Sequence, residues 1–319
     1  MHISAFVLLS VSASFLALKA DNPALVLRPA AFFDLRNSSN GIGPGSLSAR
    51  DFVVVGGELR ILVAYPRQPA TPQVVVTDLQ GAVRKAVRLP ADSEYLSVAA
   101  PVTAAEGLVW AGRTRLRQGE LALIGPGGEV IRTQPTTGPP LAILGLAGSP
   151  AWASPRQISL PVNAALPLAP SPTLILAKVA NSIIAVDQVT GEGIAIDLIS
   201  GSTGQFALSG DAVDSHRNLN ARHRQGYSEQ ATSRLLLVNS IEGAASGFAY
   251  VLLAPVSQTN GATVVKLSQD GRVTSVYQCL PPAGEGVAWN PHRIRATSDG
   301  FVLLTMNGLV AAYSKGDGN

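Results

Sequence analysis

Short apolar runs alternate with tight turns along most of the chain, a pattern typical of β-hairpins. The clearest case is Val74–Pro90, VVVTDLQGAVRKAVRLP, where two strand-like runs flank the turn Asp78–Gly81. The Asp78 side chain can accept hydrogen bonds from the backbone that follows it, and Gly81 can adopt a positive φ. We therefore predict a hairpin here, with the aspartate as a turn former.

Similar hairpins are predicted at four further places along the chain: Glu120–Thr133, Ser182–Leu198, Thr263–Gln278 and Phe301–Tyr313. Two more strand-like runs precede each of the first two hairpins, so the strands fall into groups of four. The turn glycines of these two hairpins, Gly81 and Gly128, are 47 residues apart. Asp187 and Asp270 occupy turn positions like that of Asp78, and we predict that they too form turns and are not catalytic acids.

A repeated four-stranded antiparallel unit of this length is typical of a β-propeller blade. The motif of an apolar run, Asp-x-x-Gly and a second apolar run, present at Asp78–Gly81, resembles the loose repeat of the divergent NHL- and TolB-type six-bladed propellers. The resemblance covers Ala24 to the C-terminus. It implies an all-β propeller of five or six four-stranded blades. A β-sandwich or a two-domain all-β protein is the alternative that hairpins alone would also allow.

The two ends of the chain are predicted to meet. The last hairpin stops near Ser314, just where the outer strand of its blade would start. A strand from Ala24–Leu35 can complete that sheet and close the ring, which removes exposed sheet edges. A sixth blade, or else a long loop, is predicted between Ile199 and Gly247. The proline-rich stretch Ala147–Pro172 is predicted to be an extended excursion between strands.

The N-terminus carries an uncharged apolar run, Ile3–Leu18. It is shorter than the roughly 20 residues of a membrane span and suits the core of a signal peptide. We predict a signal peptide over residues 1–20, a single propeller domain over residues 21–319, and export to the periplasm or the extracellular space. An uncleaved anchor or a buried first strand is the alternative. After removal of the signal we expect a monomer that is not an integral membrane protein.

Composition limits the possible functions. The chain has 319 residues, of which 46% are hydrophobic and 14% charged, enough for a large core. The net charge of +3 is small and its charges are scattered, so electrostatics give no case for nucleic-acid binding. The single cysteine, Cys279, excludes an intramolecular disulfide, and we predict that it is buried.

The stretch Gly210–Gln230, GDAVDSHRNLNARHRQGYSEQ, has the highest density of polar side chains in the chain. Its candidate ligand-binding residues are His216, Arg217, Arg222, His223 and Arg224. Together, Asp211, Asp214, His216 and His223 have the chemistry to ligate a divalent metal. The arginines suit an anionic sugar, a phosphate or a carboxylate, and a histidine with a carboxylate partner suits a general base. The plainest alternative is a solvated loop that joins two blades.

A second candidate site lies near the C-terminus. Trp289, His292 and Arg293 fall within five residues, just before a predicted strand. In a propeller such loops line one face of the ring, where ligands usually bind. We therefore predict that these three residues contribute to ligand binding.

No nucleophile elbow, zinc-protease motif or phosphate-binding loop is present in the sequence. We therefore expect a binding or interaction module for a protein or a small polar ligand, a sugar or an anion, without a cofactor. The main alternative is an enzyme, because propellers similar to this one include hydrolases and lactonases with a metal in the central channel. A third possibility is an envelope assembly partner of the TolB kind.

Overall fold

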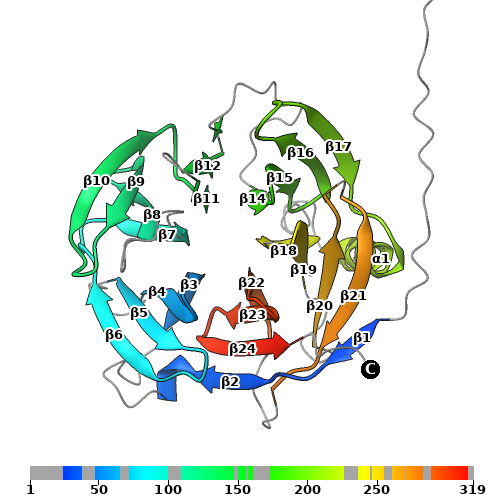
Figure 1. Cartoon of the computed structure of the whole chain (residues 1–319), viewed down its shortest axis with the longest axis horizontal. Coiled ribbons are helices and arrows are strands. Elements are labelled where there is room, and N and C mark those ends of the chain that lie inside the picture. Colours follow the sequence, from blue (N-terminus) through cyan, green and yellow to red (C-terminus); the bar gives the residue numbers. More distant parts are fainter. Residues whose placement is uncertain are drawn as a thin grey trace, which may run out of the picture.

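Six β-sheets surround a central axis in the computed structural model of the protein (Figure 1). The described residues are 24–37, 47–64, 72–99, 109–146, 150–155, 157–160, 173–225, 236–244, 246–254, 261–269, 271–282 and 289–314. In each sheet the strands follow chain order from the axis outward, except that β1 and β2 from the N-terminal segment lie outermost in two of them. The chain is therefore an all-β propeller with six blades.

The blades are numbered along the chain. Blade 1 contains β3 (Ser48–Val55), β4 (Glu58–Ala64), β5 (Gln73–Asp78) and β6 (Val83–Arg88). Blade 2 contains β7 (Glu94–Ala99), β8 (Val109–Arg115), β9 (Gln118–Ile124) and β10 (Val130–Thr136). Blade 3 contains β11 (Ala142–Leu144), β12 (Ala151–Ala153) and β13 (Ile158–Ser159).

The second half of the ring is built in the same way. Blade 4 contains β14 (Leu174–Val179), β15 (Ser182–Asp187), β16 (Glu192–Asp197) and β17 (Thr203–Ala207). Blade 5 contains β18 (Val238–Ala244), β19 (Phe248–Leu253), β20 (Ala262–Leu267) and β21 (Val273–Cys279), with β1 (Leu25–Leu27) at its outer edge. Blade 6 contains β22 (Pro291–Ala296), β23 (Gly300–Thr305) and β24 (Leu309–Ser314), with β2 (Ala31–Asp34) outermost. A 3-10 helix, Leu35–Asn37, follows β2.

The N-terminal strands close the ring, as the sequence predicts. β2 pairs antiparallel with β24, with Ala31 opposite Ala312, and so supplies the missing outer strand of blade 6. β1 pairs in parallel with β21 and adds a fifth strand to blade 5. Blades 5 and 6 are therefore tied together by one N-terminal segment, which covers edges that would otherwise be exposed.

The sixth blade is not where the sequence places it. The segment between Ile199 and Gly247 holds β17, a helix and β18, whereas the additional blade is blade 3, which falls partly within the predicted proline-rich excursion. Pro150 and Pro155 bracket β12, and its three residues, together with the two of β13, are too few to produce a recognisable alternation. Residues 161–172 of that stretch lie outside the described part.

The interpretation of Gly210–Gln230 as a solvated loop is wrong for most of this stretch, because Asp211–Gln225 form the helix α1. Asp211 and Asp214 lie in its first turn, where their carboxylates interact favourably with the helix dipole. Val213 is fully buried against Leu208 and Leu237, so tertiary packing stabilises a segment whose sequence is mostly polar. Within the described residues, no helix is long and apolar enough to cross a membrane.

Asp78 and Asp187 form turns, as the sequence predicts. The Asp78 carboxylate accepts hydrogen bonds from the backbone nitrogens of Gln80 and Ala82, at 3.0 and 2.9 Å. Asp187 accepts in the same way from Val189 and Thr190. Asp270 lies outside the described residues.

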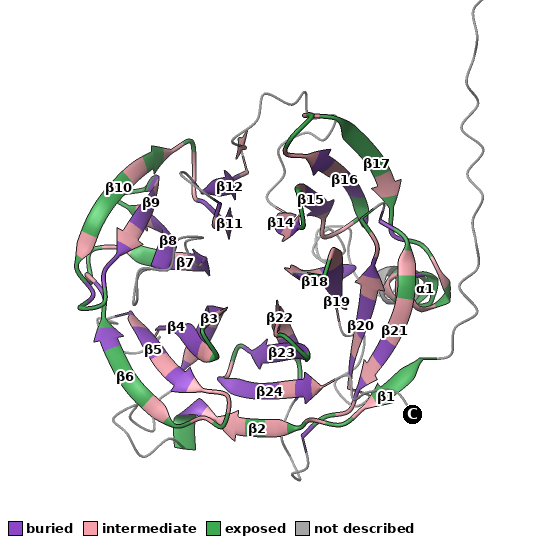
Figure 2. Cartoon of the chain, in the orientation of Figure 1, coloured by how far each residue is buried: buried purple, intermediate pink, exposed green. Residues whose placement is uncertain are grey.

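Apolar layers between neighbouring blades form the core, while exposed residues concentrate on outer strands such as β6, β10 and β17 (Figure 2). The layer between blades 5 and 6 is aromatic, and Phe301 stacks on Tyr313 with ring centroids 5.8 Å apart. Cys279 is fully buried in this layer, as predicted, and burial raises the pKa of its thiol.

Candidate functional site

The first predicted site lies on α1, at the outer rim of the ring (Figure 1). The His216 Nδ1 atom lies 2.9 Å from the Ala212 carbonyl of the preceding turn, and burial lowers the pKa of this histidine. Arg217 pairs with Asp214 at 3.3 Å and donates to the Thr190 carbonyl at 3.2 Å. These contacts attach the helix to blade 4.

The remaining residues of this predicted site are only partly described. The helix α1 includes Arg222, His223 and Arg224, whose side chains lie outside the described part of the structure. Among the described residues, no three His, Cys, Asp or Glu side chains lie close enough together to hold a metal ion. Ligand binding by α1 therefore stays a prediction, and its place is the rim of the ring and not the channel.

The structure separates the three residues of the second predicted site. Trp289 is 1% exposed and packs against Tyr313 between blades 5 and 6. His292 and Arg293 belong to β22, the innermost strand of blade 6, and not to a loop before it. The Nε2 atom of His292 lies 3.1 Å from the Arg50 carbonyl of β3. Burial lowers the pKa of His292 to about 4, and the adjacent Arg293 acts in the same direction.

Arg293 belongs to an ion-pair cluster around Asp51, which is only 3% exposed. Arg295 donates from Nη2 to the Asp51 carboxylate at 2.7 Å, and the Arg293 Nε atom lies 3.5 Å from the same oxygen. The other Asp51 oxygen accepts from the Val98 nitrogen of β7 at 3.0 Å. Arg295 also faces Glu242 of β18 at 3.5 Å. The cluster thus connects the innermost strands of blades 5, 6, 1 and 2.

Glu242 is the most perturbed carboxyl of this cluster. Burial raises its pKa to about 7, although the positive charge of Arg295 acts against the increase. Its side chain is 30% exposed, so part of it faces open space. A carboxyl with such a pKa changes its charge close to neutral pH.

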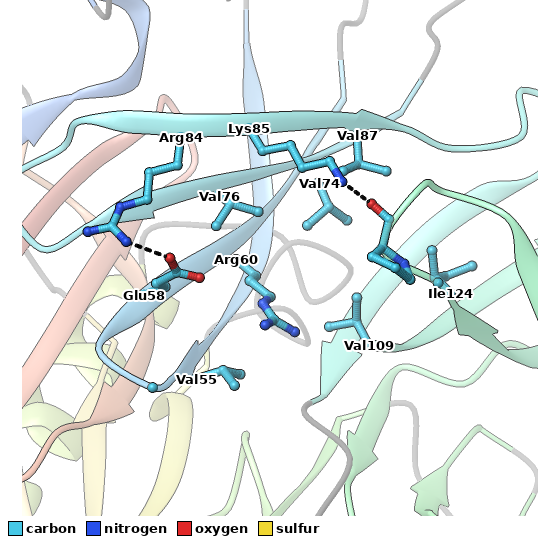
Figure 3. Close-up of a pocket in the computed structure, with 13 residues that line it drawn as sticks. Val55, Glu58, Arg60, Val74, Val76, Arg84, Lys85, Val87, Val109 and Ile124 are labelled. Atoms are coloured by element: carbon cyan, nitrogen blue, oxygen red, sulfur yellow. Dashed lines mark hydrogen bonds and ion pairs between the residues drawn. The ribbon is translucent and has the colours of Figure 1, made fainter. Parts of the chain in front are cut away.

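A cavity of about 780 Å³ lies between blades 1 and 2 (Figure 3). Its walls come from six strands and their turns and are mostly apolar. The apolar side chains of the strands are Val55, Val74, Val76, Val87, Val109 and Ile124. The described residues of this inter-blade pocket also include three cations and one carboxylate: Arg60, Arg84, Lys85 and Glu58. The volume lies within the range of small-molecule sites.

The charges of the inter-blade pocket are arranged unevenly. Arg84 pairs with Glu58 at 2.9 Å, so these two charges compensate each other. Lys85 donates to the Pro126 carbonyl of blade 2, and no carboxylate pairs with it within the described residues. Arg60 is 7% exposed and extends into the space between the blades (Figure 3). The pocket therefore combines apolar walls with an excess of positive charge.

No sequence motif marks these pocket residues, because they lie in the strands of the most regular hairpins. The available signal was the two-residue period of a strand, which puts Glu58 and Arg60 on one face of β4, and Lys85 and Val87 on one face of β6. That period does not show which neighbouring blade the face meets.

No family model matches the chain, and neither does any curated protein. Solved structures do match. The structure of U3-55K aligns with 91% of this chain and 82% of its own at 10% identity and a TM-score of 0.52. A chain of the mitotic checkpoint complex aligns over 94% of this chain and 98% of its own, at 10% identity and a TM-score of 0.52. Virginiamycin B lyase from Staphylococcus aureus aligns over 90% of this chain and 88% of its own, at 12% identity and a TM-score of 0.47. Likeness at such identities shows the propeller fold alone.

Replacement of Asp51 by Asn is expected to destabilise the protein by about 3 kcal/mol, because it removes the buried carboxylate that is the closest ion-pair partner of Arg295. Urea unfolding of the wild type and of Asp51→Asn measures the difference. Asp92→Asn is the matched control, since Asp92 pairs with Arg115 at the surface and both side chains are about half exposed. Equal unfolding midpoints for the two variants would contradict the assignment of Asp51.

Glu242 and His292 are expected to make the free energy of unfolding depend on pH in opposite directions. Burial raises the pKa of Glu242 to about 7. Its contribution to the free energy of unfolding is therefore full below about pH 4.5 and is lost as the pH rises to about 7. The pKa of His292 is lowered to about 4, so its contribution is full above about pH 6.5 and is lost as the pH falls to about 4. The two effects offset each other in the wild type.

Glu242→Gln should therefore make stability increase with pH more steeply than in the wild type, by about 2 kcal/mol between pH 4.5 and 7. His292→Asn should change the slope in the opposite direction. Urea unfolding at a series of pH values measures both slopes, and the double variant is the control. A Glu242→Gln protein with the wild-type slope would refute the raised pKa.

Proposed function

We propose that the protein is an exported binding module whose inter-blade pocket takes a small molecule with an apolar body and an anionic group. The observation that carries this proposal is the position of Lys85 and Arg60 beside a wall of valines and Ile124. An apolar body gains free energy when it leaves water for such a wall. An anionic group gains from a lysine whose charge no described carboxylate compensates.

A sugar fits this pocket less well. Its hydroxyl groups need hydrogen-bond partners on several sides, and burial without them costs free energy. Apart from its four charged side chains, the described lining offers valines, an isoleucine, two glycines and a proline. Of the ligand classes that the sequence suggests, an anion with an apolar part is thus the one that the pocket favours.

Removal of the Lys85 charge tests the proposal. Isothermal titration calorimetry with decanoate should show binding to the wild type, and Lys85→Gln should weaken it about tenfold or more, which corresponds to about 1.4 kcal/mol. Arg88→Gln is the matched control, because Arg88 lies on the same strand but outside the pocket lining. Decanol, which has the same chain without the charge, should bind more weakly than decanoate.

Two outcomes would refute the inter-blade pocket as an anion site. One is equal binding of decanoate and decanol, and the other is equal weakening by Lys85→Gln and Arg88→Gln. The Lys85 side chain is exposed, so its replacement leaves the core intact.

Export rests on the apolar run Ile3–Leu18, which lies outside the described residues. Signal peptidases remove such segments after translocation. Mass spectrometry of protein recovered from a cell that expresses the whole chain should find a mature N-terminus near Asp21. Protein that stays in the cytoplasm with Met1 intact would refute export and leave the pocket proposal unaffected.

A further inference from the structure

The central channel contains a second cavity, distinct from the inter-blade pocket. Its volume is about 460 Å³, and all six innermost strands or the residues directly after them contribute to its lining. These strands, β3, β7, β11, β14, β18 and β22, surround the axis of the ring (Figure 1). Most of the lining residues come from the C-terminal halves of these strands, so the cavity lies toward one end of the channel.

Three charged side chains line this channel cavity, and they come from three different blades. They are Lys178 of β14, Glu242 of β18 and Arg295 of β22. Arg295 is held in place by Asp51 and Glu242, as described above. The ammonium group of Lys178 has no hydrogen-bond or ion-pair partner within the described part of the chain. The rest of the lining is aliphatic or glycine.

A close approach of two strands brings Lys178 and Glu242 to the same wall. A Cβ atom on Gly243, the residue after Glu242, would overlap the carbonyl oxygen of Lys178. Only a glycine permits this separation between the backbones of β18 and β14. Lys178 and Glu242 therefore lie on neighbouring strands of one wall of the channel cavity, and no ion pair joins them within the described part of the chain.

We propose that the channel cavity is a binding site for a small oxyanion, a carboxylate or a phosphate, which is held between Lys178 and Arg295 beside Glu242. The uncompensated ammonium group supplies the attraction, and the guanidinium group, fixed by Asp51, supplies a positioned donor. The surrounding aliphatic residues reduce the access of water, which strengthens both interactions.

Glu242 makes this site sensitive to pH. When the carboxyl is protonated it can donate a hydrogen bond to an anion, and when it is ionised it repels the anion. Burial raises its pKa to about 7, so the change occurs close to neutral pH. The charged and titratable groups on the strands around Glu242 are Lys178 of β14, Tyr250 of β19, Asp51 of β3, and Arg293 and Arg295 of β22, of which Arg295 forms the ion pair with it.

The guanidinium groups of Arg293 and Arg295 keep their charge near pH 7. Tyr250 stays neutral there, because burial raises its pKa further from neutrality. His292, on the same strand as Arg295, titrates at about pH 4. A change in anion affinity around neutral pH is therefore attributable to Glu242.

Sulfate is a suitable test ligand, because its charge stays constant between pH 5.5 and 8.5. Calorimetric titration of the whole protein should show sulfate binding at pH 5.5 and at least tenfold weaker binding at pH 8.5. Lys178→Gln should weaken binding at pH 5.5 at least tenfold. Glu242→Gln should keep the affinity of pH 5.5 and lose the dependence on pH.

Lys85→Gln is the matched control, since it removes the same charge from the inter-blade pocket and should leave sulfate binding unchanged. Conversely, Lys178→Gln should leave decanoate binding unchanged, so the two proposals can fail separately. Phosphate and succinate, compared at pH 5.5, distinguish the two kinds of oxyanion. The proposal is overturned if sulfate does not bind at pH 5.5, if Lys178→Gln binds it as the wild type does, or if Glu242→Gln keeps the wild-type pH dependence.

Discussion

The joint between the last blade and the first is the contact on which the ring depends. On the outside, β2 completes blade 6 through its antiparallel pairing with β24. On the inside, Arg295 of blade 6 donates to Asp51 of blade 1. The pairing of β2 with β24 satisfies backbone groups at the outer edge, and the contact between Arg295 and Asp51 satisfies charges near the axis. The ring is therefore closed at two distances from its axis. Each contact joins residues that lie far apart along the sequence.

Asp51 also determines the geometry of the channel. A buried carboxylate is costly unless donors surround it, and here two arginines and the Val98 nitrogen do so. These donors come from the strands on both sides of β3, so the charge holds three inner strands in register. Arg295 is then fixed with its second nitrogen toward Glu242, and the end of the channel acquires a set of positioned charges.

The two cavities arise for different physical reasons. The channel cavity exists because six strands arranged around an axis leave space between them, and short side chains such as Val53, Val98 and Ala244 do not fill it. The inter-blade pocket exists because the face of blade 1 toward blade 2 carries valines and charged residues in a layer that large apolar side chains fill elsewhere. Both cavities have more cationic than anionic side chains, although the net charge of the chain is only +3.

Local sequence determined the repeated hairpins. Residues such as Asp78 and Gly81 form a turn by contacts within a few residues, and the alternation of each strand indicates its buried face. The closing strand was also predictable, because an incomplete last blade requires an outer strand. Blade 3 was not, since its strands have only two or three residues, and α1 was not, since the packing of Val213 decides its conformation. The partners of Asp51 and Lys85 lie on other blades, tens to hundreds of residues away. Only the tertiary structure decided which charges meet, because side-chain periodicity gives the face of a strand and not the blade that it faces.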